Sequence, residues 1–328
     1  MNMQEKLLTF PAPHLNRMDI VFGPVPSRRL GRSLGVNNIP PKHCTYSCIY
    51  CQLGITREIT IDRRSFYNPE EIARNVAKRV ETVAGNLDYV TFVPDGEPTL
   101  DVNLAETVKL IKEVTDKPIA ILSNASLLWM PGVRRDLELF DLVSLKLDST
   151  IPGIWRRINR PHPKLDFQKI LDGVKAFQKE FEGSLIFEVM LVKDVNDTLE
   201  NARAVSSYLS SLRFEKVYVA IPTRPPALPW VKPPNRERFK IFHRVFVDTL
   251  GPEMVDTLVE SEGSNFYVSQ DIENEILSIV KVHPLREDYA AALIRRYGGD
   301  PEMVIEKMVR KGKVKIRAYQ GYRFIHAA

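Results

Sequence analysis

All three cysteines of this 328-residue chain, Cys44, Cys48 and Cys51, lie within eight consecutive positions. Steps of four and three residues let one short loop turn three thiolates toward the same side. Three thiolates suit three irons of a cubic iron-sulfur cluster and leave the fourth iron without a protein ligand. An iron with an open position can bind a second molecule, so this loop is the predicted centre of the chemistry.

A structural zinc site and three unrelated buried thiols are the alternatives. Structural zinc takes four ligands, usually from paired cysteine knuckles, and the neighbouring candidate for the fourth is His43. His43 directly precedes Cys44, which makes it awkward to bring both side chains onto one ion. The cluster is therefore favoured over both alternatives.

The pattern C-x3-C-x-aromatic-C, with Tyr50 before the last cysteine, resembles the signature of the radical S-adenosylmethionine (radical SAM) enzymes. Residues 26–54 are also similar to a subgroup grouped with the archaeal wyosine (tRNA) synthases, and the resemblance covers residues 20–225. It implies that the open iron binds SAM. It further implies that one electron enters the sulfonium and releases methionine and a 5′-deoxyadenosyl radical, with an external electron donor such as ferredoxin or flavodoxin.

A later segment, Asp95-Gly96-Glu97-Pro98, follows a predicted strand and is similar to the family's G-G-E-P motif, which contacts the SAM amino group. Asp95 stands where the first glycine usually is, whereas Gly96 keeps the backbone freedom. The resemblance implies cofactor contacts from Gly96, Glu97 and Pro98. It implies further contacts from the cluster loop and two later strands, namely Tyr50, Ser123, Asn124, Ser144 and Lys146. The three cysteines are the metal-binding and catalytic residues in this scheme.

The composition is that of an ordinary globular protein. Hydrophobic residues make up 44% of the chain, and 46 basic against 41 acidic residues give a net charge of +5. So small an excess does not by itself indicate nucleic-acid binding. Three clustered cysteines do not make a disulfide framework, and an oxygen-labile cluster needs a reducing compartment, so we expect a cytoplasmic protein. No apolar run suggests secretion or a membrane span.

Apolar runs alternate with amphipathic stretches over most of the chain, which predicts repeated βαβ units and a parallel sheet. A short strand at 19–22 precedes predicted strands at 33–39, 88–93, 119–123, 142–147, 184–192 and 216–221. Predicted helices occupy 68–83, 101–114, 133–139, 166–181, 198–212 and 235–250. Periodicity does not distinguish an open sheet from a barrel. The family resemblance implies an α/β fold with a partial (β/α)6 barrel.

Polar and apolar residues alternate in the predicted strand at 142–147. Ser144, Lys146 and Asp148 share one face, and apolar residues form the other. Because helices cover the apolar face of such a strand, the polar face should point into a lumen that holds polar ligands. The alternative is that Lys146 and Asp148 only extend past the strand end.

Other stretches could border the site. Residues 221–234 contain six prolines and predict a stiff loop, which follows the last strand where barrel loops border active sites. Residues 155–162 place three arginines, a histidine and a tryptophan where substrate would enter, or form a charged surface around a buried Trp155. Arg28, Arg29 and Arg32 suit an anionic substrate, or pair with acidic neighbours.

The last part of the chain predicts a separate module, which divides the protein into a barrel domain at 1–262 and a winged helix-turn-helix domain at 263–328. Predicted helices start at 269 or 270, at 285 or 286, and at 300, and two strands flank Gln320-Gly321. Residues 307–328 contain seven lysines and arginines and no acidic residue. This basic face suits phosphate groups. Alternatively, it is a solvated face on a module that binds protein or docks on the barrel.

Three functions fit these features. The first is a radical SAM enzyme that modifies RNA, with tRNA favoured. Residues 1–43 contain no cysteine, whereas the similar wyosine synthases carry three more for a second cluster, so we expect one cluster and a different reaction. The second is a radical SAM enzyme that acts on a peptide or protein. The third is a redox-sensing nucleic-acid-binding protein without activity, which the Gly-Glu-Pro segment disfavours because a sensor needs no SAM site.

Overall fold

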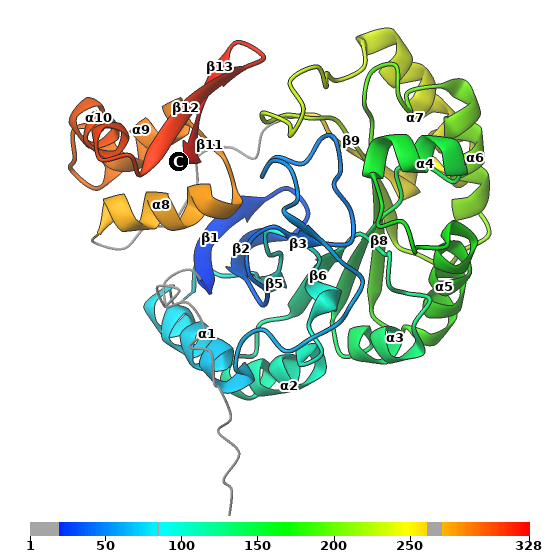
Figure 1. Ribbon diagram of the computed structural model, residues 1–328, viewed down its shortest axis with the longest axis horizontal. Helices are drawn as coiled ribbons and strands as arrows, with labels where there is room; N and C mark the ends of the chain where they lie inside the picture. The colour runs from blue at the N-terminus through cyan, green and yellow to red at the C-terminus, as the bar shows by residue number, and fades with distance from the viewer. Residues whose placement is uncertain (1–19, 84, 261–270) are drawn as a thin grey trace, which may run out of the picture.

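One curved sheet of eight strands forms the centre of the computed structural model, which describes residues 20–83, 85–260 and 271–328. The spatial order is β1-β2-β5-β6-β7-β8-β9-β10, and all neighbours run parallel except β1 and β2 (Figure 1). The strands are β1 (Val21–Ser27), β2 (Gly31–Val36), β5 (Tyr89–Phe92), β6 (Ile119–Ser123), β7 (Leu142–Lys146), β8 (Ser184–Met190), β9 (Lys216–Ala220) and β10 (Val255–Leu258). The predicted curled parallel sheet is confirmed.

Helices lie outside this sheet and connect its strands (Figure 1). They are α1 (Pro69–Val83), α2 (Leu104–Val114), α3 (Pro131–Leu137), α4 (Pro152–Asn159), α5 (Phe167–Glu180), α6 (Leu199–Leu209) and α7 (Arg236–Leu250). Four begin after a side chain that accepts a hydrogen bond from the first helical turn, at Asn68, Asp166, Thr198 and Asn235. These are the capping positions at which the sequence predicts the helices to begin.

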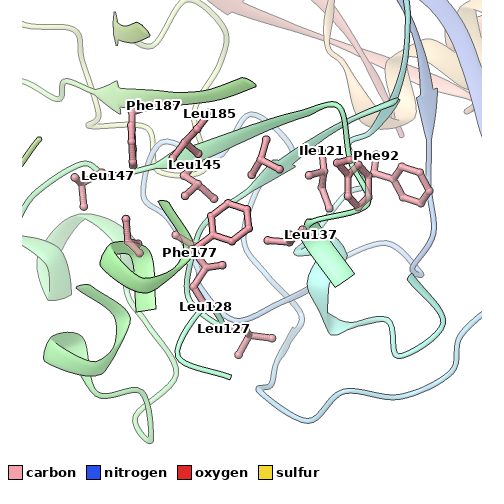
Figure 2. Close-up of a cluster of buried hydrophobic side chains, with 14 of the residues drawn as sticks. Phe92, Ile121, Leu127, Leu128, Leu137, Leu145, Leu147, Phe177, Leu185 and Phe187 are labelled. Carbon is pink, nitrogen blue, oxygen red and sulfur yellow. The ribbon is translucent and has the colours of Figure 1, made fainter. Parts of the chain in front are cut away.

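The two faces of the strands have different chemistry. Val143 and Leu145 of β7 are fully buried in the core between sheet and helices. Figure 2 shows Leu145 near Phe177 of α5, and burying side chains of this size stabilises the fold by about 1.5–3 kcal/mol each. Ser144 and Lys146 lie on the opposite face and line a cavity inside the curved sheet. The predicted polar lumen is therefore present.

Several elements differ from the sequence prediction. Strand β1 continues to Ser27, beyond the predicted end at residue 22, and pairs antiparallel with β2. Strand β10 was not predicted because Asp256 and Thr257 interrupt its short apolar run, yet it pairs parallel with β9. Helix α4 was not predicted because it has only eight residues. Within it, Arg156 and Arg157 interrupt the apolar pattern of the buried Trp155 and Ile158.

The C-terminal module contains three helices and a small sheet of order β11-β13-β12. Its elements are α8 (Ile272–Val282), β11 (Leu285–Arg286), α9 (Glu287–Arg296), α10 (Pro301–Arg310), β12 (Val314–Tyr319) and β13 (Tyr322–Ala327). Strand β11 takes the place of the predicted start of the second helix. The predicted turn is confirmed, with φ of 52° at Gln320 and 79° at Gly321. The predicted domain boundary at 262 lies outside the described residues.

The module shares a hydrophobic core with the edge of the barrel. Phe22 and Val25 of β1 belong to the same buried cluster as Ile279 of α8 (Figure 1). Arg79 of α1 also pairs with the buried Glu275 of α8 at 2.7 Å. The module is thus fixed against β1 and α1.

Candidate active site

The three cysteines line one cavity of about 340 Å³ within the barrel. They lie between β2 and α1, in a segment with a two-residue parallel pair, β3 (His43–Cys44) and β4 (Glu58–Ile59). The cavity is also lined by residues at the carboxyl ends of the parallel strands, where active sites of such barrels form. These include Asp95, Gly96, Glu97, Asn124, Lys146, Met190 and Ala220.

The segment after β5 packs directly against the cysteine loop. Gly96 forms an isolated bridge with His43, and the Glu97 N–H donates to the His43 carbonyl oxygen at 3.0 Å. A Cβ atom at Gly96 would lie 1.8 Å from that same carbonyl oxygen. Only glycine allows this approach, so the motif's glycine joins the cysteine loop to the barrel.

The contacts of Asp95 account for its presence at the position of the motif's first glycine. Its carboxylate lies 3.1 Å from the Lys42 ammonium, and its carbonyl oxygen accepts from the Lys42 N–H at 2.7 Å. Both side chains line the cavity and are largely buried. A carboxylate in place of the first glycine therefore adds a second connection between the same two loops.

We expect Gly96→Ala to lower the free energy of unfolding by about 2–3 kcal/mol, because the clash separates the two loops. Iron loading should also fall, because the clash displaces His43, which directly precedes the iron ligand Cys44. Thermal unfolding and iron content measure both effects. Gly153→Ala is the matched control, because a Cβ there meets nothing within 4 Å. Equal stability of the two variants would contradict the predicted contact.

One side-chain amide lies beside each of two cysteine sulfur atoms. Asn124 Nδ2 lies 3.5 Å from Cys44 Sγ, and Asn159 Nδ2 lies 3.4 Å from Cys48 Sγ. Burial raises the pKa of all three thiols, that of Cys48 to about 12, so bare thiolates are unfavourable there. Three partly buried sulfur ligands, two of them with N–H donors beside them, fit an iron-sulfur cluster, whose iron would compensate the thiolate charge.

His43 does not serve as a fourth ligand. Its Nε2 lies 2.8 Å from the Glu58 carboxylate, its Nδ1 lies 3.2 Å from two backbone oxygens, and it does not line the cavity. In the described ranges, no three His, Cys, Asp or Glu side chains are placed to hold a single ion. A cubic cluster takes each thiolate on a different iron, so its ligands need not converge on one point. The geometry favours the cluster over the zinc alternative.

Glu97 is 1% exposed, and its carboxylate accepts four hydrogen bonds. Thr99 donates through its N–H at 3.2 Å and its hydroxyl at 2.6 Å. The Ser123 hydroxyl donates at 2.8 Å and the Asn124 N–H at 2.7 Å. Burial raises the pKa of Glu97, against the effect of these donors. Glu97 and Asn124 line the cavity, whereas Ser123 and Pro98 do not, so Ser123 instead positions the Glu97 carboxylate.

A buried ionic network crosses the lumen. The Lys146 ammonium lies 2.6 Å from Glu188 of β8 and 5.1 Å from the centre of the Tyr50 ring. Glu188 also pairs with Arg29, which reaches in from the turn between β1 and β2. Burial lowers the pKa of Lys146, and the nearby Asp148 acts in the opposite direction. The Tyr50 hydroxyl donates to Asp148 at 2.5 Å, which fixes this ring beside the cysteines.

The proline-rich segment and the C-terminal module complete the mouth of the cavity. Arg224 of that segment donates to Gln52 Oε1 at 2.8 Å and lies 3.0 Å from His283 Nε2. All three residues line the cavity, as does Val282. The sequence analysis did not single out His283 or Glu188, because each lies outside the recognised motifs, and it gave Gln52 no role although this residue lies in the similar segment at 26–54.

The remaining predicted stretches divide between lumen and surface. Arg29 lines the lumen, whereas Arg32 pairs with Asp88 at 2.9 Å on the outside. No residue of the stretch at 155–162 lines the cavity, so a substrate entrance is not found there. The structure fits the alternative prediction, a charged surface around a buried Trp155. Asn159 of this stretch nevertheless contacts Cys48, and no sequence signal marked it.

Among the helices of the described ranges, none has both the length and the apolar composition that a bilayer span requires.

Comparisons with known proteins agree with this geometry. The model of the radical SAM superfamily matches residues 38–204. A UPF0026 protein of Methanocaldococcus jannaschii is 43% identical over 308 residues, which cover 94% of this chain and 95% of that protein. A probable dual-specificity RNA methyltransferase RlmN of Thermotoga petrophila is 25% identical over 223 residues, which cover 63% of this chain and 59% of that protein.

Solved structures share the fold. The structure described as native anSMEcpe with bound AdoMet gives a TM-score of 0.50 at 16% identity, covering 76% of this chain and 66% of that chain. A spore photoproduct lyase mutant also gives 0.50, at 11% identity, covering 72% of this chain and 79% of that chain. The resemblance to wyosine synthases stays a prediction, because the relatives described here carry the UPF0026 and RlmN names.

Proposed function

Because this chain belongs to the radical SAM superfamily, we propose that it is a radical SAM enzyme that modifies RNA, with tRNA as the favoured substrate. Its cofactors are a [4Fe-4S] cluster and SAM. When bound, they would supply one-electron cleavage of the sulfonium to a 5′-deoxyadenosyl radical for hydrogen abstraction from the substrate. The external reductant would be a ferredoxin or flavodoxin.

The chain's own residues would hold and orient these groups. Cys44, Cys48 and Cys51 would each bind one iron. Glu97, which is one of the residues that line the cavity, would accept from the SAM ammonium. Lys146 lines the same cavity as the cysteines and would attract the SAM carboxylate, although its ammonium also pairs with Glu188 at 2.6 Å.

Three other predicted contacts have different surroundings. Ser144 lines the cavity beside Lys146 and can reach the SAM carboxylate or ribose, whereas Ser123 acts through Glu97. Asn124 lines the cavity, although its amide nitrogen bonds the Thr45 hydroxyl at 2.8 Å and its amide oxygen accepts from the Ser126 N–H at 3.0 Å. The walls of the cavity would limit the access of water and stray hydrogen donors to a reactive radical.

The observation that carries this proposal is the shared cavity of the three cysteines, Glu97 and Lys146. RNA is the favoured substrate because the RlmN relative is named an RNA methyltransferase and because the C-terminal module has a basic face. The three helices and hairpin of that module support the winged-helix interpretation. The same elements can also recognise a peptide, which is the competing substrate class.

Nucleoside analysis of RNA tests the proposal. We expect tRNA from a strain lacking this protein to lose one modified nucleoside, or to accumulate its precursor, in comparison with the parent strain. Restoring the wild-type gene should restore the nucleoside, whereas a Cys51→Ala gene should not. Identical nucleoside profiles in tRNA and ribosomal RNA would contradict the RNA proposal and favour a peptide substrate.

A further inference from the structure

Strand β12 presents two different faces. Val314 and Ile316 pack into the core of the module. Because side chains alternate along a strand, Lys315, Arg317 and Tyr319 lie on the opposite face. That face turns toward the barrel, since the Tyr319 hydroxyl donates to the Pro222 carbonyl oxygen at 3.3 Å.

The basic residues of the module are not equivalent. Lys307 pairs with Glu273, Lys313 lies 4.0 Å from the same carboxylate, and Arg323 pairs with Glu287 at 2.8 Å. In contrast, Lys315 and Arg317 are exposed, and neither forms an ion pair within the described part of the chain. These two charges on β12 are therefore available to an anionic partner.

Aromatic residues lie on the same face of the small sheet. Tyr319 is directly opposite Tyr322 of β13, which is 49% exposed. The Arg286 guanidinium covers the Tyr322 ring at 3.7 Å from its centre. Basic and aromatic side chains on one surface are the combination that binds single-stranded nucleic acid, through phosphate contacts and base stacking.

This surface leads to the mouth of the lumen. Tyr319 contacts Pro222, which lies two residues before Arg224 at the cavity rim. Arg224 in turn bonds Gln52, the residue after Cys51. Among the described residues, five cations line the cavity against three carboxylates, so the positive charge continues inward from β12.

We propose that Lys315, Arg317, Tyr322 and Arg224 form one track that guides a single-stranded RNA segment from the module into the lumen. The inference rests on the proposed RNA-modifying function and adds the part of the surface that the RNA follows. Charged residues on an edge strand such as β12 also prevent unwanted strand pairing. These two roles of the charges can be distinguished, because only the track requires them to contribute to RNA binding.

Salt-dependent binding of deacylated bulk tRNA tests the track. Each phosphate contact contributes about 0.7–0.9 to the slope of log affinity against log salt. We therefore expect the double variant Lys315→Gln/Arg317→Gln to lower that slope by about two, and to weaken binding about tenfold at moderate salt. Arg224→Gln should lower the slope by about one.

The matched control removes two exposed charges from the barrel helix α7, in the variant Arg236→Gln/Lys240→Gln, with the same change in net charge. Cluster absorbance should be unchanged in the double variants, which excludes misfolding as the cause. Tyr322→Ala should weaken binding without changing the slope, because stacking releases no counterions.

The outcomes separate the two proposals. If tRNA binds and the β12 variant behaves like the α7 control, the track is wrong while the proposed function stands. If the wild-type protein binds no RNA in a salt-dependent manner, the proposed function fails and the track fails with it. A selective loss in the β12 and Arg224 variants supports the track.

Discussion

Replacing Cys48 with alanine should abolish the iron-sulfur cluster. The wild-type protein, reconstituted without oxygen, should hold about four irons, because three thiolates suit one cubic cluster. In the wild-type protein, burial raises the pKa of the Cys48 thiol to about 12, so binding to iron is what holds it as a thiolate. In the variant, one iron loses this ligand. Visible absorbance and iron content should fall to near background, and SAM cleavage should cease with them.

A neighbouring loop substitution is the control for Cys48→Ala. Ser47→Ala removes a hydroxyl that accepts from the Thr56 N–H at 3.3 Å, and it leaves every sulfur in place. This variant should keep its iron. Cluster loss in both variants would mean that the loop is merely fragile. About eight irons in the wild-type protein, or zinc without iron, would overturn the single-cluster assignment.

The second large effect is expected at Glu97. Glu97→Gln removes the negative charge but keeps a side chain of nearly the same size and one carbonyl acceptor. A hydrogen bond to a charged group contributes about 1.5–3 kcal/mol, so SAM binding should weaken by about 10- to 100-fold. The cluster should remain, because Glu97 accepts hydrogen bonds from protein groups and does not ligate iron in this scheme. Equilibrium binding of SAM to the loaded protein measures the change.

Thr99→Val is the matched control for Glu97→Gln. It deletes the hydroxyl that donates to Glu97 at 2.6 Å and keeps the carboxylate charge. We expect a loss of about 1 kcal/mol in the free energy of unfolding, with SAM affinity nearly unchanged. If Glu97→Gln binds SAM as the wild type does, Glu97 is a purely structural residue that holds Thr99, Ser123 and Asn124 together.

The sequence predicted the framework well because its signals are local. The cysteine spacing lies in one loop, the helix caps at Asp166 and Asn235 act within one turn, and the alternation around Ser144 and Lys146 follows from strand geometry. These features need no information about distant parts of the chain. The lumen assignment of Ser144 and Lys146 was correct for this reason.

The unpredicted residues depend on contacts that are distant in sequence. Glu188 was not predicted, and it meets Arg29 across the lumen although about 160 positions separate them. That Arg29 pairs with an acidic residue was one of its two predicted alternatives, but the sequence did not name the partner. Asn159 reaches Cys48 from a short helix, and His283 reaches the mouth from the C-terminal module. No periodicity indicates such contacts, since they form only when elements that are distant in sequence pack against one another. For the same reason, Ser123 was assigned to the cofactor although its hydroxyl faces Glu97.

The hydrophobic cluster that joins β1 to α8 cannot form until both of these parts of the chain have been synthesised. Phe22 and Val25 leave the ribosome before Ile279 and Ile325, which help to cover them and follow about 250–300 positions later in the chain. At about 5–20 residues per second, this delay is roughly 15–60 seconds. For that period the nascent chain carries an uncovered apolar strand edge. Chaperone binding to this strand would protect it from aggregation until α8 and β13 emerge.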